Sequence, residues 1–236
     1  MPSATDRSLN VKPESAGPRS SAYDSDAPAS PSRRGDAGGA GSVQKKLAAT
    51  VKEVAAATPS RPVEVWATDE HRIGLKPIRR RVWAPIGDRP VALGHHRCLW
   101  LYIIAFVQPA SGETVWYLFD GVSKPMFEAM LAAFARETGT GRERSIILVL
   151  DNAGFHAPAD LCVPDGIRLV FLPPYTPELQ PAERLWTLVD EPVVNKYFKT
   201  LDALDAVVAE RCRELHPDTI KAKAQFACRP RPVNPI

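Results

Sequence analysis

The chain has 236 residues, 44% of them hydrophobic, with a formal net charge of +3 and a pI near 8.7. This length allows one ordinary domain with a tail, or two small domains, and the hydrophobic content suffices for a buried core. No run of about 18 apolar residues could span a bilayer, and the N-terminus lacks the pattern of a secretory signal. We therefore expect an intracellular, cytoplasmic protein with no membrane partner. The four cysteines are widely spaced, which argues against a zinc ribbon and a disulfide framework.

The first 60 residues divide into two segments of different composition. Residues 1–42 are dominated by Ser, Ala, Gly and Pro, and they contain too few bulky apolar side chains to offset the entropy of ordering. This stretch is predicted to be a disordered tail. Residues 43–60 are predicted to form a linker helix, because apolar side chains recur there at helical spacing before Thr58-Pro59 closes the pattern: Val43, Leu47, Val51 and Val54.

Strand patterns follow. Residues 63–69 alternate in a way that predicts a strand ending in the carboxylate of Asp69. Residues 82–84 predict a brief second strand. Two longer apolar runs, at 98–107 and 114–119, flank a segment of turn composition and predict an antiparallel hairpin.

The second half of the chain alternates helix and strand patterns. A helix is predicted over residues 124–138, and the apolar run 146–150 is typical of a central strand covered on both faces. Asp151 follows that run directly. A second buried strand is predicted at residues 167–172, reached through a short helix and followed by helices to the end. Together these elements predict a mixed α/β sheet flanked by helices.

A proline-rich segment, residues 173–181, leads to a third carboxylate, Glu183. Pro181 suits the first position of a helix, which makes Gln180 the predicted cap and Glu183 the third helical residue. The apolar face that would dock this helix is supplied by four residues: Leu185, Trp186, Leu188 and Val189.

Asp69, Asp151 and Glu183 form a chemically coherent set. Carboxylate oxygens suit Mg²⁺ and Mn²⁺, and two such ions can hold both oxygens of an in-line phosphoryl displacement. Without metal, three clustered carboxylates would repel one another. Each residue taken alone also has a plainer interpretation, because an Asp after a strand is often a turn or helix cap and a Glu in a first helical turn often complements the helix dipole.

Three blocks of sequence resemble the mariner-type superfamily of bacterial insertion-sequence transposases, over about residues 43–226. They span Trp66–Pro77, Leu150–His156, and the proline-rich segment through Trp186, with the last two acids 183 − 151 = 32 positions apart. The resemblance implies a ribonuclease-H-like catalytic domain over residues 61–226, followed by a flexible tail at 227–236. It implies that Asp69, Asp151 and Glu183 bind two divalent ions, Mg²⁺ or Mn²⁺. DNA would be the partner, as transposon ends and target, together with a second copy or a partner transposase subunit.

Other residues are weaker candidates for the same site. Asn152 and His156 lie in the second block and could orient an acid or touch DNA, although a structural role is equally open for His156. Glu70 should point to the other face of its strand, at the surface or in support of the site. Basic residues between positions 72 and 97 form either a solvated face or contacts to the DNA backbone, for which the candidates are Arg72, Arg79, Arg80 and Arg81.

Two departures from the family pattern bear on function. Gln180 stands where the family usually has Asn. Such transposases also begin with helix-turn-helix modules that recognise the terminal inverted repeats, and residues 1–42 lack the composition to form them. We therefore expect a truncated transposase that retains metal-dependent DNA cleavage and strand transfer. The alternative is a non-enzymatic remnant or accessory protein that binds DNA or a full-length transposase. A nuclease acting on RNA–DNA hybrids is disfavoured by the proline-rich block.

Overall fold

The computed structural model describes residues 37–87, 91, 93–151, 161–174, 176 and 179–225. The predicted tail at 227–236 and most of the predicted tail at 1–42 lie outside these residues, as do residues 152–160, most of the segment in which a short helix is predicted. Within the described part of the chain, no helix is long and apolar enough to cross a membrane.

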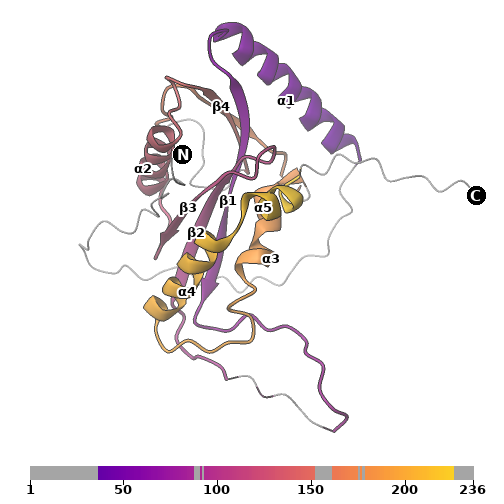
Figure 1. Ribbon diagram of the computed structural model, residues 1–236, viewed down its shortest axis with the longest axis vertical. Helices are drawn as coiled ribbons and strands as arrows, with labels where there is room; N and C mark the ends of the chain where they lie inside the picture. Colours follow the sequence, from indigo (N-terminus) through magenta and orange to yellow (C-terminus); the bar gives the residue numbers. More distant parts are fainter. Residues whose placement is uncertain are drawn as a thin grey trace, which may run out of the picture.

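Five strands form one mixed sheet in the order β3-β2-β1-β4-β5 (Figure 1). Their bounds are β1 Val63–Gly74, β2 Trp100–Val107, β3 Thr114–Phe119, β4 Ser145–Leu150 and β5 Ile167–Phe171. The β1–β2 and β2–β3 pairs are antiparallel, whereas β1–β4 and β4–β5 are parallel. The predicted mixed sheet and its antiparallel hairpin are therefore confirmed.

Helix α2 (Lys124–Glu137) covers one face of the sheet, which we call the α2 face. Phe134 stacks on Phe106 with ring centroids 4.5 Å apart and meets Trp66 edge-on at 5.0 Å. Every residue of β4 is buried, as predicted for a central strand. The edge strand β5, in contrast, is only partly buried, because just one of its long edges is paired.

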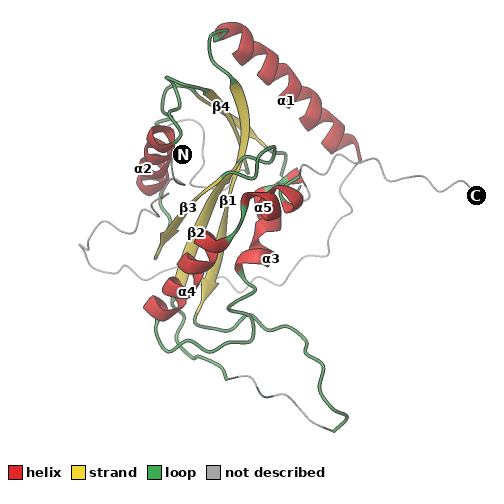
Figure 2. Cartoon of the chain, viewed as in Figure 1, coloured by secondary structure: helices red, strands yellow, loops and turns green. Residues whose placement is uncertain are grey.

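The remaining helices cover the opposite face, which we call the α3 face (Figure 2). They are α1 Ala37–Ala57, the 3₁₀ helix η4 Ala182–Leu185, α3 Trp186–Val189, α4 Leu201–Glu214 and α5 Pro217–Lys223. Helix α1 packs through the predicted apolar stripe, yet it begins at Ala37 rather than at residue 43. Residues 37–42 carry no bulky apolar side chain, so apolar periodicity could not indicate this extra length.

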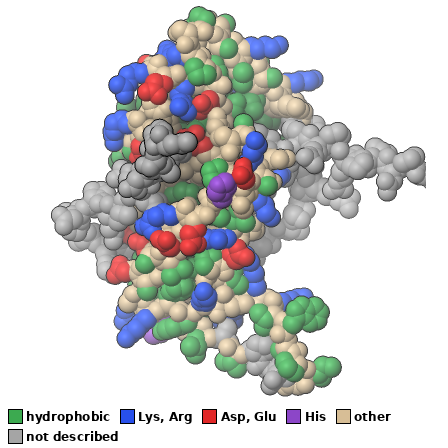
Figure 3. Space-filling model, viewed as in Figure 1, with side chains coloured by type: hydrophobic (Ala, Val, Ile, Leu, Met, Phe, Trp, Pro, Cys, Tyr) green, Lys and Arg blue, Asp and Glu red, His purple; other side chains and the backbone are tan. Residues whose placement is uncertain are grey.

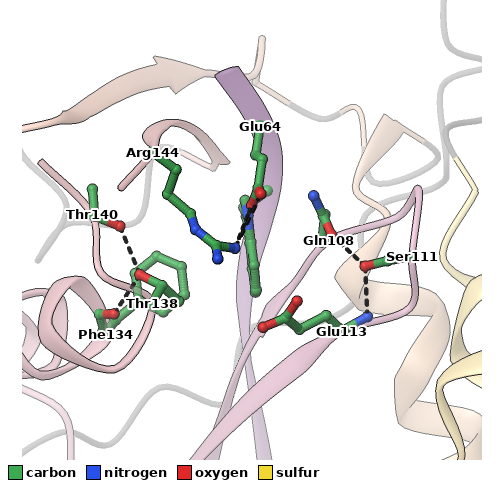
Figure 4. Close-up of polar contacts among 9 residues, drawn as sticks. Glu64, Gln108, Ser111, Glu113, Phe134, Thr138, Thr140 and Arg144 are labelled. Carbon is green, nitrogen blue, oxygen red and sulfur yellow. Dashed lines mark hydrogen bonds and ion pairs between the residues drawn. The ribbon is translucent and has the colours of Figure 1, made fainter. Parts of the chain in front are cut away.

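Polar contacts fix the end of the sheet where β1 and β4 begin (Figure 4). The guanidinium of Arg144 donates to Glu64 at 3.0 Å, and the indole N–H of Trp66 donates to the same carboxylate at 2.9 Å. Nearby, the β2–β3 turn contains Gly112 with a φ of 81°. A Cβ at this glycine would lie 1.9 Å from the carbonyl oxygen of Pro217, so the turn packs closely against α5.

A long segment leaves the sheet between β1 and β2, and its described residues, 75–87, 91 and 93–99, extend away from the body (Figure 1). We call it the β1–β2 arm. Asn195 holds its base, because its side-chain oxygen accepts from the Arg80 N–H at 2.9 Å and its amide donates to the Arg80 carbonyl at 3.1 Å. The brief strand predicted at residues 82–84 is wrong. Those residues are exposed, and no strand among the described residues pairs with them.

Candidate active site

Asp69 and Asp151 are brought side by side by the register of β1 and β4. The last residues paired between these parallel strands are Ala67 and Val149, and both point into the core of the α3 face. Asp69 and Asp151 each come two residues later, so the alternation of side chains points them to that same face. The prediction that Asp69 ends its strand is wrong, because β1 continues to Gly74 against β2. Asp69 instead lies just beyond the end of the parallel ladder.

Glu183 reaches this place from η4, which packs on the α3 face of β1. The predicted helix start differs in detail: Pro181 occupies the cap position with no side-chain capping bond, and Glu183 is the second residue of the 3₁₀ helix. Gln180 is not the cap. Its side chain is buried, and its amide donates to the Thr68 carbonyl at 2.9 Å, so it ties the proline-rich segment to the strand residue just before Asp69.

The carboxyl group of Asp69 is the most deeply placed of the three acids. Its pKa is raised from the ordinary value of 3.8 to about 6, chiefly by burial. Hydrogen bonds from the Trp186 side chain and the Glu70 backbone lower the pKa, whereas the negative charges of Asp151 and Glu183 raise it. The three acids are thus close enough for their charges to act on one another.

Glu70 points to the α2 face, as predicted from strand alternation, but it is partly buried. Burial raises the pKa of its carboxyl from 4.5 to about 8, and the charges of Asp151 and Asp69 add to this effect. Together with Arg72, Tyr102 and Val122, Glu70 lines a hollow of about 420 Å³. A fourth carboxylate therefore lies within electrostatic reach of the predicted triad.

The raised pKa of Glu70 leads to an expected dependence of stability on pH. The folded chain holds this proton more tightly than the unfolded chain, so the resulting stabilisation is complete below about pH 4.5 and is lost as pH rises through about 8. In EDTA, the free energy of unfolding of Glu70→Gln should therefore fall less between pH 5 and 8 than that of the unaltered chain, as measured by urea denaturation. Glu210→Gln, at an exposed position on α4, should keep the original slope. Equal slopes for all three proteins would contradict this cause.

The weaker candidates are distributed differently. Arg72 is exposed on β1, with its guanidinium 4.4 Å from the ring centroid of Trp100. Three further basic candidates lie exposed at the base of the β1–β2 arm: Arg79, Arg80 and Arg81. Asn152 and His156 lie outside the described residues. Figure 3 shows acidic side chains flanked by Lys and Arg across the middle of the visible face, rather than a patch of one sign.

Three contacts near Asp69 are absent from the sequence-based prediction. The indole N–H of Trp186 donates to Asp69 Oδ2 at 2.9 Å, and the ring of His71 stacks on Trp186 with centroids 5.0 Å apart at 13°. His71 Nε2 in turn lies 2.8 Å from Oδ1 of the buried Asp190. In the sequence these residues stand at the spacings Asp69-x-His71 and Trp186-x₃-Asp190. Neither spacing indicates which residue of the strand contacts which residue of the helix.

A divalent metal ion such as Mg²⁺ or Mn²⁺ suits these side chains, because Asp69, Asp151 and Glu183 offer only carboxylate oxygens as metal ligands. Among the described residues, no three Asp, Glu, His or Cys side chains stand close enough together to hold a metal ion as they are placed. Asp151 and Glu183 are exposed, whereas Asp69 is held by hydrogen bonds. Two of the three acids therefore lie at the surface, and the third is fixed by hydrogen bonds.

Known proteins resemble this chain in sequence or in fold. An uncharacterized protein of Sinorhizobium fredii (strain NBRC 101917 / NGR234), y4pE/y4sA, is 35% identical over 105 residues, which are 44% of this chain and 76% of that protein. The Mos1 strand transfer complex matches with a TM-score of 0.54 at 13% identity, covering 86% of this chain and 62% of the Mos1 chain. The Mos1 mariner paired end complex with Mn matches with a TM-score of 0.56 at 13% identity, covering 85% and 62%.

The matches to the Mos1 structures show the fold, which is the ribonuclease-H-like arrangement predicted from the sequence. The chain spans 62% of the length of the Mos1 chains that it resembles. A family model described as DDE superfamily endonuclease matches residues 64–205, which include all three predicted acids. The chain therefore belongs to the DDE superfamily of endonucleases.

Proposed function

We propose that this chain is the catalytic domain of a transposase, which cleaves DNA and joins its ends by metal-dependent phosphoryl transfer. The observation that carries the proposal is that Asp69 lies where the β1–β4 ladder ends, within electrostatic reach of Asp151 and Glu183. In sheets with parallel strands, groups just beyond the carboxyl ends of the strands commonly line the functional crevice. Membership of the endonuclease superfamily supports the same reaction class.

In this proposal, Asp69, Asp151 and Glu183 hold two Mg²⁺ or Mn²⁺ ions. Bound ions would supply Lewis-acid stabilisation of the phosphate and a more acidic water or hydroxyl nucleophile. Asp69 provides a fixed oxygen, because the Trp186 side chain and the Glu70 backbone orient its carboxylate. Asp151 and Glu183, which are exposed, would supply the remaining carboxylate oxygens. The Mn-containing Mos1 complex, which shares this fold, supports the choice of metal.

DNA is the proposed partner, as transposon ends and as target, and the cytoplasm is the proposed location of the protein. The fold is shared with Mos1 proteins solved as a strand transfer complex and as a pre-cleavage transpososome. Exposed guanidinium groups at Arg72, Arg79, Arg80 and Arg81 are suited to phosphate contacts that position DNA without reading its sequence.

A second copy of the chain is the proposed protein partner, and the β1–β2 arm is its contact. Five large apolar side chains on the arm are more than half exposed: Val82, Trp83, Ile86, Val91 and Leu93. Figure 3 shows apolar side chains gathered at the lower right, on the arm. Apolar side chains concentrated on one exposed segment mark a protein contact more often than single scattered ones do.

Nicking of supercoiled plasmid DNA tests the proposed activity. The purified chain should convert the plasmid to open circles in Mg²⁺ or Mn²⁺, with little sequence preference, and should not do so in EDTA. Absence of nicking under every metal condition would favour the non-enzymatic alternative, a remnant or accessory protein. Cleavage of RNA–DNA hybrids without cleavage of DNA duplexes would instead identify a ribonuclease with this fold.

A further inference from the structure

We propose that Trp186, supported by His71 and Asp190, is a positioning residue that fixes the Asp69 carboxylate for metal binding. This inference rests on the proposed function, because it assumes that Asp69 binds the metal ion. Its basis is two pairs of contacting residues, one after the other along β1, that join β1 to α3. We call each pair a level. At the first level, Trp186 donates to Asp69. At the second level, His71 pairs with Asp190.

The spacing of the two levels follows from the geometry of the elements. Asp69 and His71 are two residues apart on a strand, which separates them by about 6.7 Å along its axis. Trp186 and Asp190 are four residues apart at a helical turn, which separates them by about 6 Å. These similar spacings are compatible with the formation of both pairs between the same two elements. The stacking of His71 on Trp186, at 5.0 Å between centroids, links the levels to each other.

The polar groups that make these contacts on the α3 side are buried. Trp186 and Asp190 are 7% and 8% exposed, so their polar groups cannot rely on water. A buried indole N–H needs an acceptor, and here the acceptor is a predicted metal ligand rather than a backbone carbonyl. Packing at position 186 requires only the apolar surface of a large aromatic ring. The polar contact is the part of the arrangement that packing does not require.

The hydrogen bond leaves Asp69 able to bind a metal ion. A carboxylate accepts at about four lone-pair positions, and the Trp186 indole and the Glu70 backbone N–H occupy two of them. Hydrogen bonds of this kind orient a metal ligand, and losing one typically weakens metal affinity by about 10- to 100-fold. His71 and Asp190 hold the indole in the plane that this bond requires.

Trp186→Phe tests the proposal, because it keeps an aromatic ring at this position while removing the N–H donor. We expect its affinity for Mn²⁺, measured by titration calorimetry in the absence of DNA, to fall by about 10- to 100-fold. The matched control is Trp66→Phe, on the same strand as Asp69. It removes another 2.9 Å indole–carboxylate bond, to Glu64 on the α2 face. This control should bind Mn²⁺ within about twofold of the unaltered chain, since Glu64 is not a proposed metal ligand.

Equal affinity in Trp186→Phe and the unaltered chain would overturn the positioning role while leaving the proposed function intact. Failure of the unaltered chain to bind Mn²⁺ would overturn the metal site, and with it this inference. The supporting pair is tested separately. Asp190→Ala should weaken Mn²⁺ binding by about tenfold. Asp190→Asn, which keeps an oxygen acceptor for His71, should restore most of it, and equal binding by the two variants would overturn the supporting role.

An indole N–H signal tests the same bond without relying on a substitution at position 186. The chain has five tryptophans, so its ¹⁵N–¹H spectrum should contain five indole signals. The signal of Trp186 should move when Mg²⁺ is added and in Asp69→Asn, whereas that of Trp66 should stay in place. A Trp186 signal unmoved by both changes would overturn the proposal.

Discussion

Asp151→Asn is expected to lower metal-dependent nicking of plasmid DNA by about 1000-fold. The substitution keeps the size of the side chain and removes the negative charge that a divalent ion needs. Stabilisation of the transition state by a bound metal is worth several kcal/mol, and about 4 kcal/mol corresponds to three orders of magnitude in rate. Asp69→Asn and Glu183→Gln should lower the rate to a similar degree. Initial rates in Mg²⁺ and in Mn²⁺ would measure the effect.

The effects of replacing these carboxylates on the nicking rate should not be additive. If they work as one unit, the double variant of Asp69 and Asp151 should nick DNA no more slowly than either single variant. Asp165→Asn is the matched control, because Asp165 is an exposed aspartate in the turn that leads into β5, where the β4–β5 pairing begins. It should keep the original rate. Nicking by Asp151→Asn at that same rate would contradict the assignment of this residue.

Replacing Trp83 and Ile86 together by serine should abolish dimerisation at micromolar concentration. Both side chains are fully exposed in the single chain. Truncating a buried interface anchor costs about 2 kcal/mol or more, which raises the dimer Kd by about 30-fold for each residue. Sedimentation equilibrium over a range of concentrations would measure the Kd.

The exposure of Trp83 and Ile86 allows an effect on dimerisation to be distinguished from an effect on folding. Because neither side chain packs in the core, the double substitution should leave the melting temperature of the monomer almost unchanged. Lys52→Ser, at an exposed position on α1, should dimerise like the unaltered chain. If the unaltered chain remained monomeric at every concentration, or if the arm variant dimerised as tightly, the arm would not be the contact between copies.

The apolar patterns of the sequence predicted those elements whose local conformational preference agrees with the packing around them. The hairpin, helix α2 and strand β4 are confirmed because their apolar patterns match the faces that they bury. Beyond Asp69 the local pattern did not suffice. Residues 70–74 contain His71, which is partly buried, and Arg72, which is exposed, and they stay in the sheet because β2 pairs with them. That pairing is set more than 25 residues further along the chain.

The candidate site shows the same division. The acids could be grouped by chemistry and by resemblance to a family. In the structure the charges of Asp151 and Glu183 act on Asp69. The grouping of the three acids as a metal site, and their catalytic roles, remain proposals. The partners of Asp69 could not be predicted, because Trp186 is 117 residues away in sequence and a tryptophan at helical spacing usually indicates core packing. The role of Gln180 differs from the predicted helix cap for a related reason. A side chain next to a helix start suggests a cap, but here burial directs its amide to the Thr68 carbonyl.

The central claim is that Asp69, Asp151 and Glu183 together form a site for divalent metal ions. Anomalous scattering from crystals grown with Mn²⁺ would test it most directly. The expected result is a peak at about 2.1 Å from oxygens of Asp69 and Asp151, with Glu183 at that ion or at a second one. A map with Mn²⁺ bound elsewhere, and no peak beside Asp69 at saturating concentration, would contradict the claim.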